Sequence, residues 1–441
     1  MRAWRRLDRT ALNTSRRKFL ALSGALALGA GAFAASRYWP EQGLFNPCRA
    51  KLPEALARHE LVRAAWEGLN PGSVWDGHCH LLGNGDSGSG IYLNPAMASV
   101  LDPVQYAQRL FYMNASCADA APGRVDRTYV ERMQILLDDM RPGAKLLLFA
   151  FDASVTEAGE VSWERTGFYV PNAYAAAVAE RHAQYFEWAA SVHPYRRDCV
   201  ERLEAAARRG ARAIKWLPAA MGMDPASKLC DRFFEALSRH DLPLITHAGL
   251  ERAVQGTDAQ ELGNPLRLRR ALDHGVRVVV AHCASMGQDR DIDRGAHGPA
   301  TDSFALFARM MDEPRYFGRV YGDISAVTQS SRAGVALASV IQREDWHARL
   351  LNGSDYPLPG VFPLYSLDYL VGLGYIEQSA APLFKRLREH NPLLFDFVLK
   401  RSLRAGGKRL AGGIFETRAF FDRRTAAGTV SSAWRGVGRH K

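Results

Sequence analysis

Short apolar runs alternate with amphipathic stretches between about residues 73 and 404. The stretches 198–209, 228–240 and 266–274 have helical periodicity, and Asp241 and Gly275 are plausible stops after the last two. The apolar runs read as about eight strands, ending near His80, Asp152, Ser191, Leu217, His247, Ala284, Ser325 and Asp355. Strands that alternate with helices favour a parallel sheet wrapped by helices, so we predict an α/β fold, a (β/α)8 TIM barrel.

The rest of the chain divides around this predicted barrel, residues 73–404. We expect an N-terminal linker and short helix in residues 35–72, with the helix at 52–68. Residues 380–388 and 392–403 read as C-terminal helices that complete the barrel. Residues 405–441 are basic and rich in glycine, which is typical of a solvated tail.

Polar side chains stand at the ends of several predicted strands. Side chains alternate along a strand, so His78 and His80 project to one side and Cys79 to the other. His247, His282 and Asp355 end later strands, and the carboxyl ends of barrel strands meet on one face. Imidazole and carboxylate together suit zinc, manganese or iron, and an open coordination position marks a catalytic site. The pattern predicts a metal-dependent hydrolase.

The motifs DGHCH (76–80), IK (214–215), THAG (246–249), AHC (281–283) and GSDYP (353–357) occur in an order that resembles the amidohydrolase superfamily, closest to its amidohydrolase-related branch of metal-dependent hydrolases. The resemblance implies a barrel with one or two divalent metals and a metal-activated water as nucleophile. It implies that His78, His80 and His247 are metal ligands. It also implies that His282 is a ligand or a catalytic histidine, and that Asp355 holds the metal or takes the proton of the water.

Lys215 stands at the end of an apolar run, where an uncompensated ammonium is costly. In binuclear members of the superfamily a lysine at this place is carboxylated and bridges both metals, whereas in mononuclear members it can stand nearby. Carbamylation of Lys215 is therefore one explanation. A salt bridge to a substrate carboxylate, or to an acid such as Glu187, is the other.

The mechanism follows from the predicted metal, with zinc as the default and manganese or iron as alternatives. A divalent ion lowers the pKa of its water from about 16 to near 7. Asp355 is placed to accept that proton and return it to the leaving group, and His282, if it is not a ligand, can stabilise an oxyanion. The substrate is expected to be a small amide, ester or lactone.

Two other functions are compatible with the same residues. A metal-dependent decarboxylase is favoured if basic residues lie close to the metal, with Arg196 as a candidate carboxylate clamp. A non-enzymatic periplasmic binding protein is the second alternative, although it has no need of an intact ligand set. His193, after the third predicted strand, is a further residue that can reach the site.

The N-terminus is typical of an exported protein. Residues 15–20 (SRRKFL) resemble the twin-arginine motif, and an apolar run at 19–35 contains a small-x-small pattern at 32–34. We predict a signal peptide at 1–34, the twin-arginine export machinery as a partner, and a periplasmic location. A Sec signal or an uncleaved anchor is the alternative.

Net charge and cysteine content narrow the classes of function and the cell compartment that the sequence allows. The net charge is +11. Residues 1–18 contain seven Lys or Arg and one acid, and residues 401–441 contain ten Lys or Arg and two acids. These two ends together therefore carry more positive charge than the net charge of the whole chain. The body is therefore not a nucleic-acid binder, and membrane contact is expected only through the signal or the tail. Among six cysteines, Cys79 and Cys283 read as buried hydrophobes, whereas Cys48 and Cys117 can bridge in an oxidising compartment.

The glycine-rich loop at 83–90 lacks the Gly-Lys-Ser/Thr ending of a phosphate-binding loop. Its Gly-Asp-Ser-Gly also lacks the upstream partners of a trypsin-like serine protease. We expect a flexible loop after the first strand, able to cover the metal or touch substrate. The sequence specifies neither the substrate nor the oligomeric state.

Overall fold

The computed structural model describes residues 41–254 and 259–422. The predicted signal peptide at 1–34 and the last part of the expected tail, 423–441, lie outside these described residues. Within the described residues, no helix has the length and apolar character needed to cross a membrane.

A ring of eight parallel strands forms the centre of the described chain. The strands are β1 (Trp75–His80), β3 (Lys145–Phe149), β5 (Phe186–Ala189), β6 (Ile214–Trp216), β7 (Leu244–Thr246), β8 (Val278–Val280), β11 (Val320–Asp323) and β12 (Leu350–Leu351). They pair in chain order as two sheets, β1-β3-β5 and β6-β7-β8-β11-β12.

Two parallel bridges join these sheets into a closed barrel. Ala190 pairs with Ile214 between β5 and β6, and Cys79 pairs with Tyr356 between β1 and the segment after β12. The backbone amide of His80 donates to the carbonyl of Tyr356 at 2.9 Å, and that of Lys215 to the carbonyl of Ala190 at 2.7 Å. The predicted (β/α)8 barrel is confirmed.

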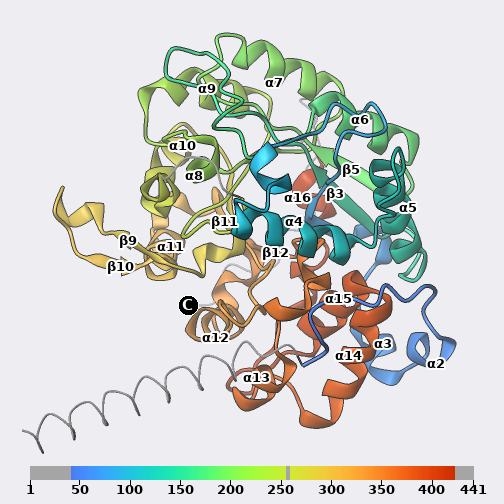
Figure 1. Ribbon diagram of the computed structural model, residues 1–441. Coiled ribbons are helices and arrows are strands. Elements are labelled where there is room, and N and C mark those ends of the chain that lie inside the picture. The colour runs from blue at the N-terminus through green and yellow to red at the C-terminus, as the bar shows by residue number, and fades with distance from the viewer. Residues whose placement is uncertain (1–40, 255–258, 423–441) are drawn as a thin grey trace, which may run out of the picture.

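Helices follow the strands and cover the outside of the barrel (Figure 1). They are α5 (Val125–Asp138), α6 (Asn172–Arg181), α7 (Cys199–Arg208), α9 (Asp231–Arg239), α10 (Arg269–Asp273), α11 (Ser303–Asp312), α12 (Val335–Gln342), α14 (Ala381–His390) and α15 (Pro392–Ser402). Their buried faces are apolar, as Leu203 on α7 and Phe233 on α9 illustrate. Asp241 and Gly275 have positive φ angles of 47° and 82°, as expected of helix stops.

The N-terminal segment differs in detail from the expected single helix at 52–68. It contains two short helices, α2 (Glu54–Ala57) and α3 (Glu60–Ala65), because His59 adopts an extended backbone and caps α3. Helix α3 packs against α15. A disulfide joins Cys48 to Cys117, which confirms the pairing considered from the sequence.

The segment that follows α15 was expected to be a solvated tail from residue 405, yet residues 405–422 pack against the barrel. A 3-10 turn, η13 (Gly412–Ile414), and α16 (Arg418–Phe421) bury Ile414, Phe415 and Phe421. The hydroxyl of Thr417 donates to the carbonyl of Trp75 at 2.7 Å. These apolar side chains close the end of the barrel at which β1 begins.

Insertions enlarge the opposite end, where the strands finish. Between β1 and α5 the chain forms β2 (Tyr92–Leu93) and α4 (Pro103–Ser116), and β2 pairs with β4 (Phe168–Tyr169) from the loop after β3. Helix α4 lies across the middle of the view in Figure 1. Smaller additions are α8 (Pro218–Met221), α13 (Leu367–Gly372) and a hairpin of β9 (Gln288–Arg290) and β10 (Ala300–Asp302) at the left edge of that view.

Candidate metal and substrate site

A cavity of about 420 Å³ opens at the carboxyl ends of the strands. All six residues predicted as metal ligands or catalytic groups line it: His78, His80, Lys215, His247, His282 and Asp355. The rest of its wall is mostly apolar, with Phe111 and Met113 of α4 on one side and Phe151 and Phe168 on another. The insertions after β1 and β3 therefore complete a substrate-sized pocket over the barrel.

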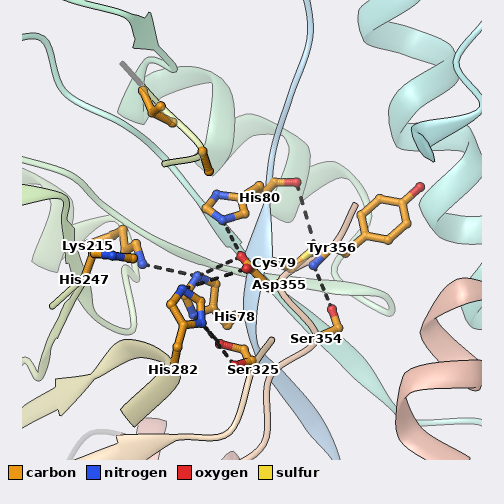
Figure 2. Close-up of polar contacts among 12 residues, drawn as sticks. His78, Cys79, His80, Lys215, His247, His282, Ser325, Ser354, Asp355 and Tyr356 are labelled. Carbon is orange, nitrogen blue, oxygen red and sulfur yellow. Dashed lines mark hydrogen bonds and ion pairs between the residues drawn. The ribbon is translucent and has the colours of Figure 1, made fainter. Parts of the chain in front are cut away.

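His78, His80 and Asp355 form a close group of candidate ligands, the ligand group (Figure 2). One ligand atom from each lies within 4.8 Å of the others. Asp355 Oδ1 is 2.8 Å from His80 Nε2 and 3.4 Å from His78 Nε2. The period of two along β1 brings both imidazoles to the cavity, whereas Cys79 is buried on the other side against Met133.

Asp323, at the end of β11, contacts His78 on the side of the imidazole ring that faces away from Asp355. Its Oδ2 lies 2.8 Å from His78 Nδ1, and its Oδ1 accepts from the backbone amides of His282, at 3.1 Å, and Ser325, at 2.9 Å. Ser325 Oγ contacts Asp323 and lies 2.8 Å from His282 Nδ1. Sequence reasoning did not single out Asp323, although it stands at a strand end as the recognised residues do.

His282 occupies an unusual backbone position just beyond β8. His282, Cys283 and Ala284 have φ angles of 55°, 51° and 48°, so β8 ends at Val280 rather than near Ala284. This left-handed backbone is costly for residues with a side chain, and its persistence at a site indicates that surrounding bonds impose it. His282 Nε2 lies 3.8 Å from Asp355 Oδ2. The turn thus aims the imidazole at the ligand group.

Asp355 is also left-handed, with a φ of 64°. Its backbone amide donates to the carbonyl of His78 at 2.8 Å. Asp76 ties the same two segments together, since its carboxylate accepts from the amides of His78, at 3.1 Å, and Ser354, at 2.8 Å. The aspartate of the DGHCH motif therefore positions ligands and is not itself one of the group.

Lys215 is buried, with 1% of its surface exposed, and its Nζ lies 3.2 Å from His78 Nε2 and 4.8 Å from the ring centre of Phe149. Glu187, considered from the sequence as a salt-bridge partner, is not one. Its carboxylate binds Lys145 at 2.8 Å and Arg212 at 2.9 Å on the outer side of β5. Carbamylation and pairing with a substrate carboxylate are the explanations that remain.

His247 lines the cavity beside His282, with 5.2 Å between the ring centres. Its Nδ1 lies 3.3 Å from Glu251 Oε2 and its Nε2 3.4 Å from the carbonyl of Leu250. It stands outside the groups of ligand atoms that come within 4.8 Å of one another in the described residues. Its role as a ligand stays a prediction.

Two further candidates lie outside the cavity. Arg196, considered as a carboxylate clamp, makes two bonds of 2.7 Å to Asp152, so its guanidinium is already paired. His193 is buried, with its Nε2 3.2 Å from the carbonyl of Met221. Neither residue lines the cavity. The interpretation of Arg196 as a substrate clamp was wrong because the sequence did not show its partner.

The glycine-rich loop at 83–90 is tethered to α5. The buried carboxylate of Asp126 accepts from the amide of Asn84 at 2.8 Å and from the hydroxyls of Ser87, at 2.9 Å, and Ser89, at 2.7 Å. Gly83 lines the cavity, and a Cβ at this position would lie 2.2 Å from Asp126 Oδ1. The loop therefore contributes to the cavity wall as a fixed element.

Burial and neighbouring charges set the protonation of the site. Burial lowers the pKa of Lys215 to about 8, and burial together with the nearby Lys215 charge lowers the pKa of His78 to about 4. Burial alone would raise the pKa of Asp355, but the imidazoles of His282 and His78 outweigh it and hold that pKa well below its usual range. A neutral imidazole beside an ionised carboxylate is the form in which these groups bind metals.

The residues present fit a divalent metal. When His78 Nδ1 donates to Asp323, the lone pair of His78 Nε2 faces Asp355 and His80, and this arrangement of an imidazole backed by a carboxylate is usual for metal-ligating histidines. Two imidazoles and a carboxylate that converge on one cavity suit zinc, manganese or iron.

The fold and the site define a (β/α)8-barrel protein of the amidohydrolase superfamily. A family model described as amidohydrolase matches residues 75–392, and the chain belongs to this family. A search of curated proteins found no match.

Solved structures with a similar fold include three that share 10–14% of their residues with this chain. An uncharacterized TIM-barrel protein from Bordetella bronchiseptica is 14% identical, with 71% of this chain and 98% of that chain covered and a TM-score of 0.43. A probable 2-pyrone-4,6-dicarboxylic acid hydrolase from Acinetobacter baumannii is 10% identical (72% and 96% covered, TM-score 0.41). A 5-carboxyvanillate decarboxylase from Novosphingobium aromaticivorans, with bound manganese, is 14% identical (73% and 96%, 0.40).

Proposed function

We propose that this protein is a metal-dependent hydrolase that cleaves an amide, ester or lactone of a small molecule. The observation that carries the proposal is the convergence of His78, His80 and Asp355 in a substrate-sized cavity, with Asp323 behind His78. Membership of the amidohydrolase family supports it. A barrel without catalysis would have no physical need for this buried and mutually supported set of ligands.

Each polar residue of the site has a separate task in this proposal. A bound divalent ion supplies a water of lowered pKa and a polarised substrate carbonyl. Asp355 accepts the proton of the attacking water and returns it to the leaving group. His282, whose Nδ1 is held by Ser325, presents Nε2 to the cavity and is placed to stabilise the oxyanion. Lys215 adds a positive charge beside the reacting carbonyl, unless carbamylation converts it into a ligand.

Metal content and turnover test the proposal together. We expect the purified protein to hold one or two equivalents of a divalent metal, with zinc as the default and manganese or iron as alternatives. The variants His78→Ala and Asp355→Ala should lose the metal together with hydrolysis of a panel of aryl esters, lactones and amides. A folded protein that takes up neither zinc nor manganese would refute the metal mechanism. Two equivalents would favour a Lys215-bridged pair of ions.

A decarboxylase is the second candidate, and one observation favours it. The cavity that holds the ligand group also contains the buried cationic side chains of Lys215 and Arg332, which suit a substrate carboxylate. The two reactions are separated by their products, because decarboxylation releases carbon dioxide from an aromatic or enoic acid and hydrolysis consumes water. Metal-dependent release of carbon dioxide without any hydrolytic activity would replace the first proposal by the second.

We also propose that the protein is exported to the periplasm by the twin-arginine route. The Cys48–Cys117 disulfide supports this location, since structural disulfides persist in oxidising compartments. Fractionation of cells that produce the full chain, compared with an Arg16→Lys/Arg17→Lys variant, provides the test. Export of the variant at the normal level would refute the twin-arginine route.

A further inference from the structure

Helix α4 carries an exposed apolar face. Six large apolar side chains, which we call the apolar face, are exposed on this helix and on the two segments beside it: Leu44, Phe45, Val100, Leu101, Val104 and Leu110. Val100, Leu101 and Val104 are 71%, 88% and 60% exposed. Surface helices normally turn charged side chains to water, yet Arg109 is the one charged residue of α4, and its guanidinium lies over the Tyr106 ring at 5.5 Å.

Contacts within the chain hold the parts of the apolar face together. Phe45 stacks on Phe111 of α4, with 5.4 Å between the ring centres. The Cys48–Cys117 disulfide fastens the same segment to the residue that follows the helix. Residues 99–102 lead directly into the first turn of α4. The apolar face therefore lies over the helix that forms one wall of the cavity, in the middle of the view in Figure 1.

Exposed aromatic side chains adjoin this face. Trp163 is exposed and packs edge-on against Tyr92 and Tyr169 of the β2–β4 ribbon, with 5.2 and 5.4 Å between the ring centres. From β2 the chain runs through a 3-10 turn, η2 (Pro95–Ala98), which packs against α4, into residues 99–102. Tryptophan and tyrosine beside exposed aliphatic side chains are typical of a surface that meets a membrane, because their rings favour the headgroup level.

The sequence before residue 41 indicates what covers the apolar face. Residues 19–35 form an apolar run without a charged side chain, and the residues at 37–39, Arg-Tyr-Trp, are typical of the end of a membrane-inserted segment. Eight residues, 36–43, separate this run from Leu44, and a fully extended chain of that length spans about 29 Å at most. Any bilayer that holds the run is therefore within reach of the apolar face.

We propose that the apolar face docks on a lipid bilayer, with Leu101 and Val104 among the acyl chains and Trp163 at the headgroup level. This docking adds a third membrane contact to those expected of the signal and the tail. It goes beyond the proposed reaction and does not depend on it. A second copy of the chain would cover the same side chains, and the experiment distinguishes the two occupants.

A fluorescent label at single positions of the full chain tests the docking. Leu101→Cys is labelled with a thiol dye, and labelling is selective because four of the native cysteines are buried and the other two form the disulfide. The protein is mixed with vesicles of phosphatidylethanolamine and phosphatidylglycerol that contain brominated acyl chains as quencher. We expect quenching at least about 3-fold stronger at residue 101 than at Phe317→Cys, because an apolar face enters the acyl boundary by roughly 5–10 Å. Phe317 is the matched control, since it is also exposed but stands before β11, at the opposite end of the barrel.

A charge variant tests which side chains hold the bilayer. Val100→Asp/Val104→Asp should fold normally, because both side chains already face water, and should lower quenching at residue 101 to the level of residue 317. Phe317→Asp, which adds a charge at the opposite end of the barrel, should leave quenching at residue 101 unchanged. Salt at about 0.5 M should also leave it unchanged, because screening weakens contacts between charges and not apolar insertion.

Four results would overturn the inference. They are equally weak quenching at residues 101 and 317, quenching that survives Val100→Asp/Val104→Asp, quenching that salt abolishes, and a label at residue 101 that is shielded from an aqueous quencher without vesicles as the protein concentration rises. The third result would assign the contact to the basic ends of the chain, and the fourth would assign the apolar face to a second copy. Lipid quenching at residue 101 in a protein without hydrolytic activity would uphold the inference while the proposed reaction fails.

Discussion

Replacing Asp323 by asparagine should weaken metal binding without removing any ligand. Asp323 Oδ1 accepts from two backbone amides, at 2.9 and 3.1 Å, so the carbonyl oxygen of an asparagine would remain on that side. Its amide nitrogen would then face His78 Nδ1, at the place where Oδ2 lies 2.8 Å away in the wild type. Two donors cannot share a hydrogen bond, so the proton of His78 would move to Nε2, and the ring would lose the lone pair that faces Asp355.

The size of the effect follows from this change of tautomer. Loss of an outer partner of a metal-bound histidine typically costs 10- to 100-fold in metal affinity. That range corresponds to about 1.4–2.7 kcal/mol. We expect Asp323→Asn to raise the dissociation constant for zinc by this factor, measured by competition with a chromophoric chelator at fixed pH. Hydrolytic activity at saturating zinc should fall as well, because the same carboxylate holds the backbone of His282.

Asp289→Asn is the matched control, because Asp289 on β9 is likewise buried and accepts a hydrogen bond from Ser303 of α11, outside the cavity. This variant should bind zinc as the wild type does. Unchanged zinc affinity in a folded Asp323→Asn protein would show that His78 does not depend on Asp323 for its tautomer, and the reasoning about the ligand group would be refuted.

Three further changes test other parts of the structure. The double variant Cys48→Ser/Cys117→Ser, which opens a loop of 69 residues, should lose roughly 4 kcal/mol of stability in denaturant unfolding, and a wild type insensitive to reductant would contradict this. Burial raises the pKa of Asp396 from 3.8 to about 7, so its contribution to stability is fully present below pH 3.8 and is lost as the pH rises through about 7. Asp396→Asn should therefore flatten the fall in unfolding free energy between these limits, and an unchanged slope would count against the raised pKa. A Cβ at Gly353 would lie 2.5 Å from the Cβ of His78, so Gly353→Ala should lower the free energy of unfolding by about 1–3 kcal/mol and reduce the metal content. A variant with a normal melting temperature and normal metal content would show that β1 shifts to accommodate the added methyl group.

The sequence predicted the order of the strands and the candidate ligands near their ends because both depend on local patterns. A period of two placed His78 and His80 on one face, and the preference of barrels for chemistry at strand ends drew His282 and Asp355 into the same site. The structure brings all of these residues to one cavity.

What the sequence did not show depends on contacts between distant segments. Asp323 acts through His78, which is 245 positions away in the chain, and no local pattern reveals that pairing. Arg196 and Arg332 look alike as sequence positions, but only the folded chain shows that Asp152 neutralises the first, whereas no ion pair joins the second to an acid among the described residues. Residues 405–422 were misjudged for the same reason, because Phe421 is buried against the barrel end near Gly77.

The backbone at the site explains why the ligands keep their positions. His282 and Asp355 are both left-handed, and such backbone costs of order 1–3 kcal/mol at each residue unless surrounding bonds impose it. The bond to His282 comes from the side chain of Asp323 on β11, and the bond to Asp355 from the carbonyl of His78 on β1. The ligands are thus fixed by bonds between barrel strands, whereas the wall around the substrate comes from α4 and the loops after β3 and β11. Changes in those loops can therefore alter which substrate is bound while the group of candidate ligands stays intact, and this separation explains why the ligand motifs are recognisable in the sequence.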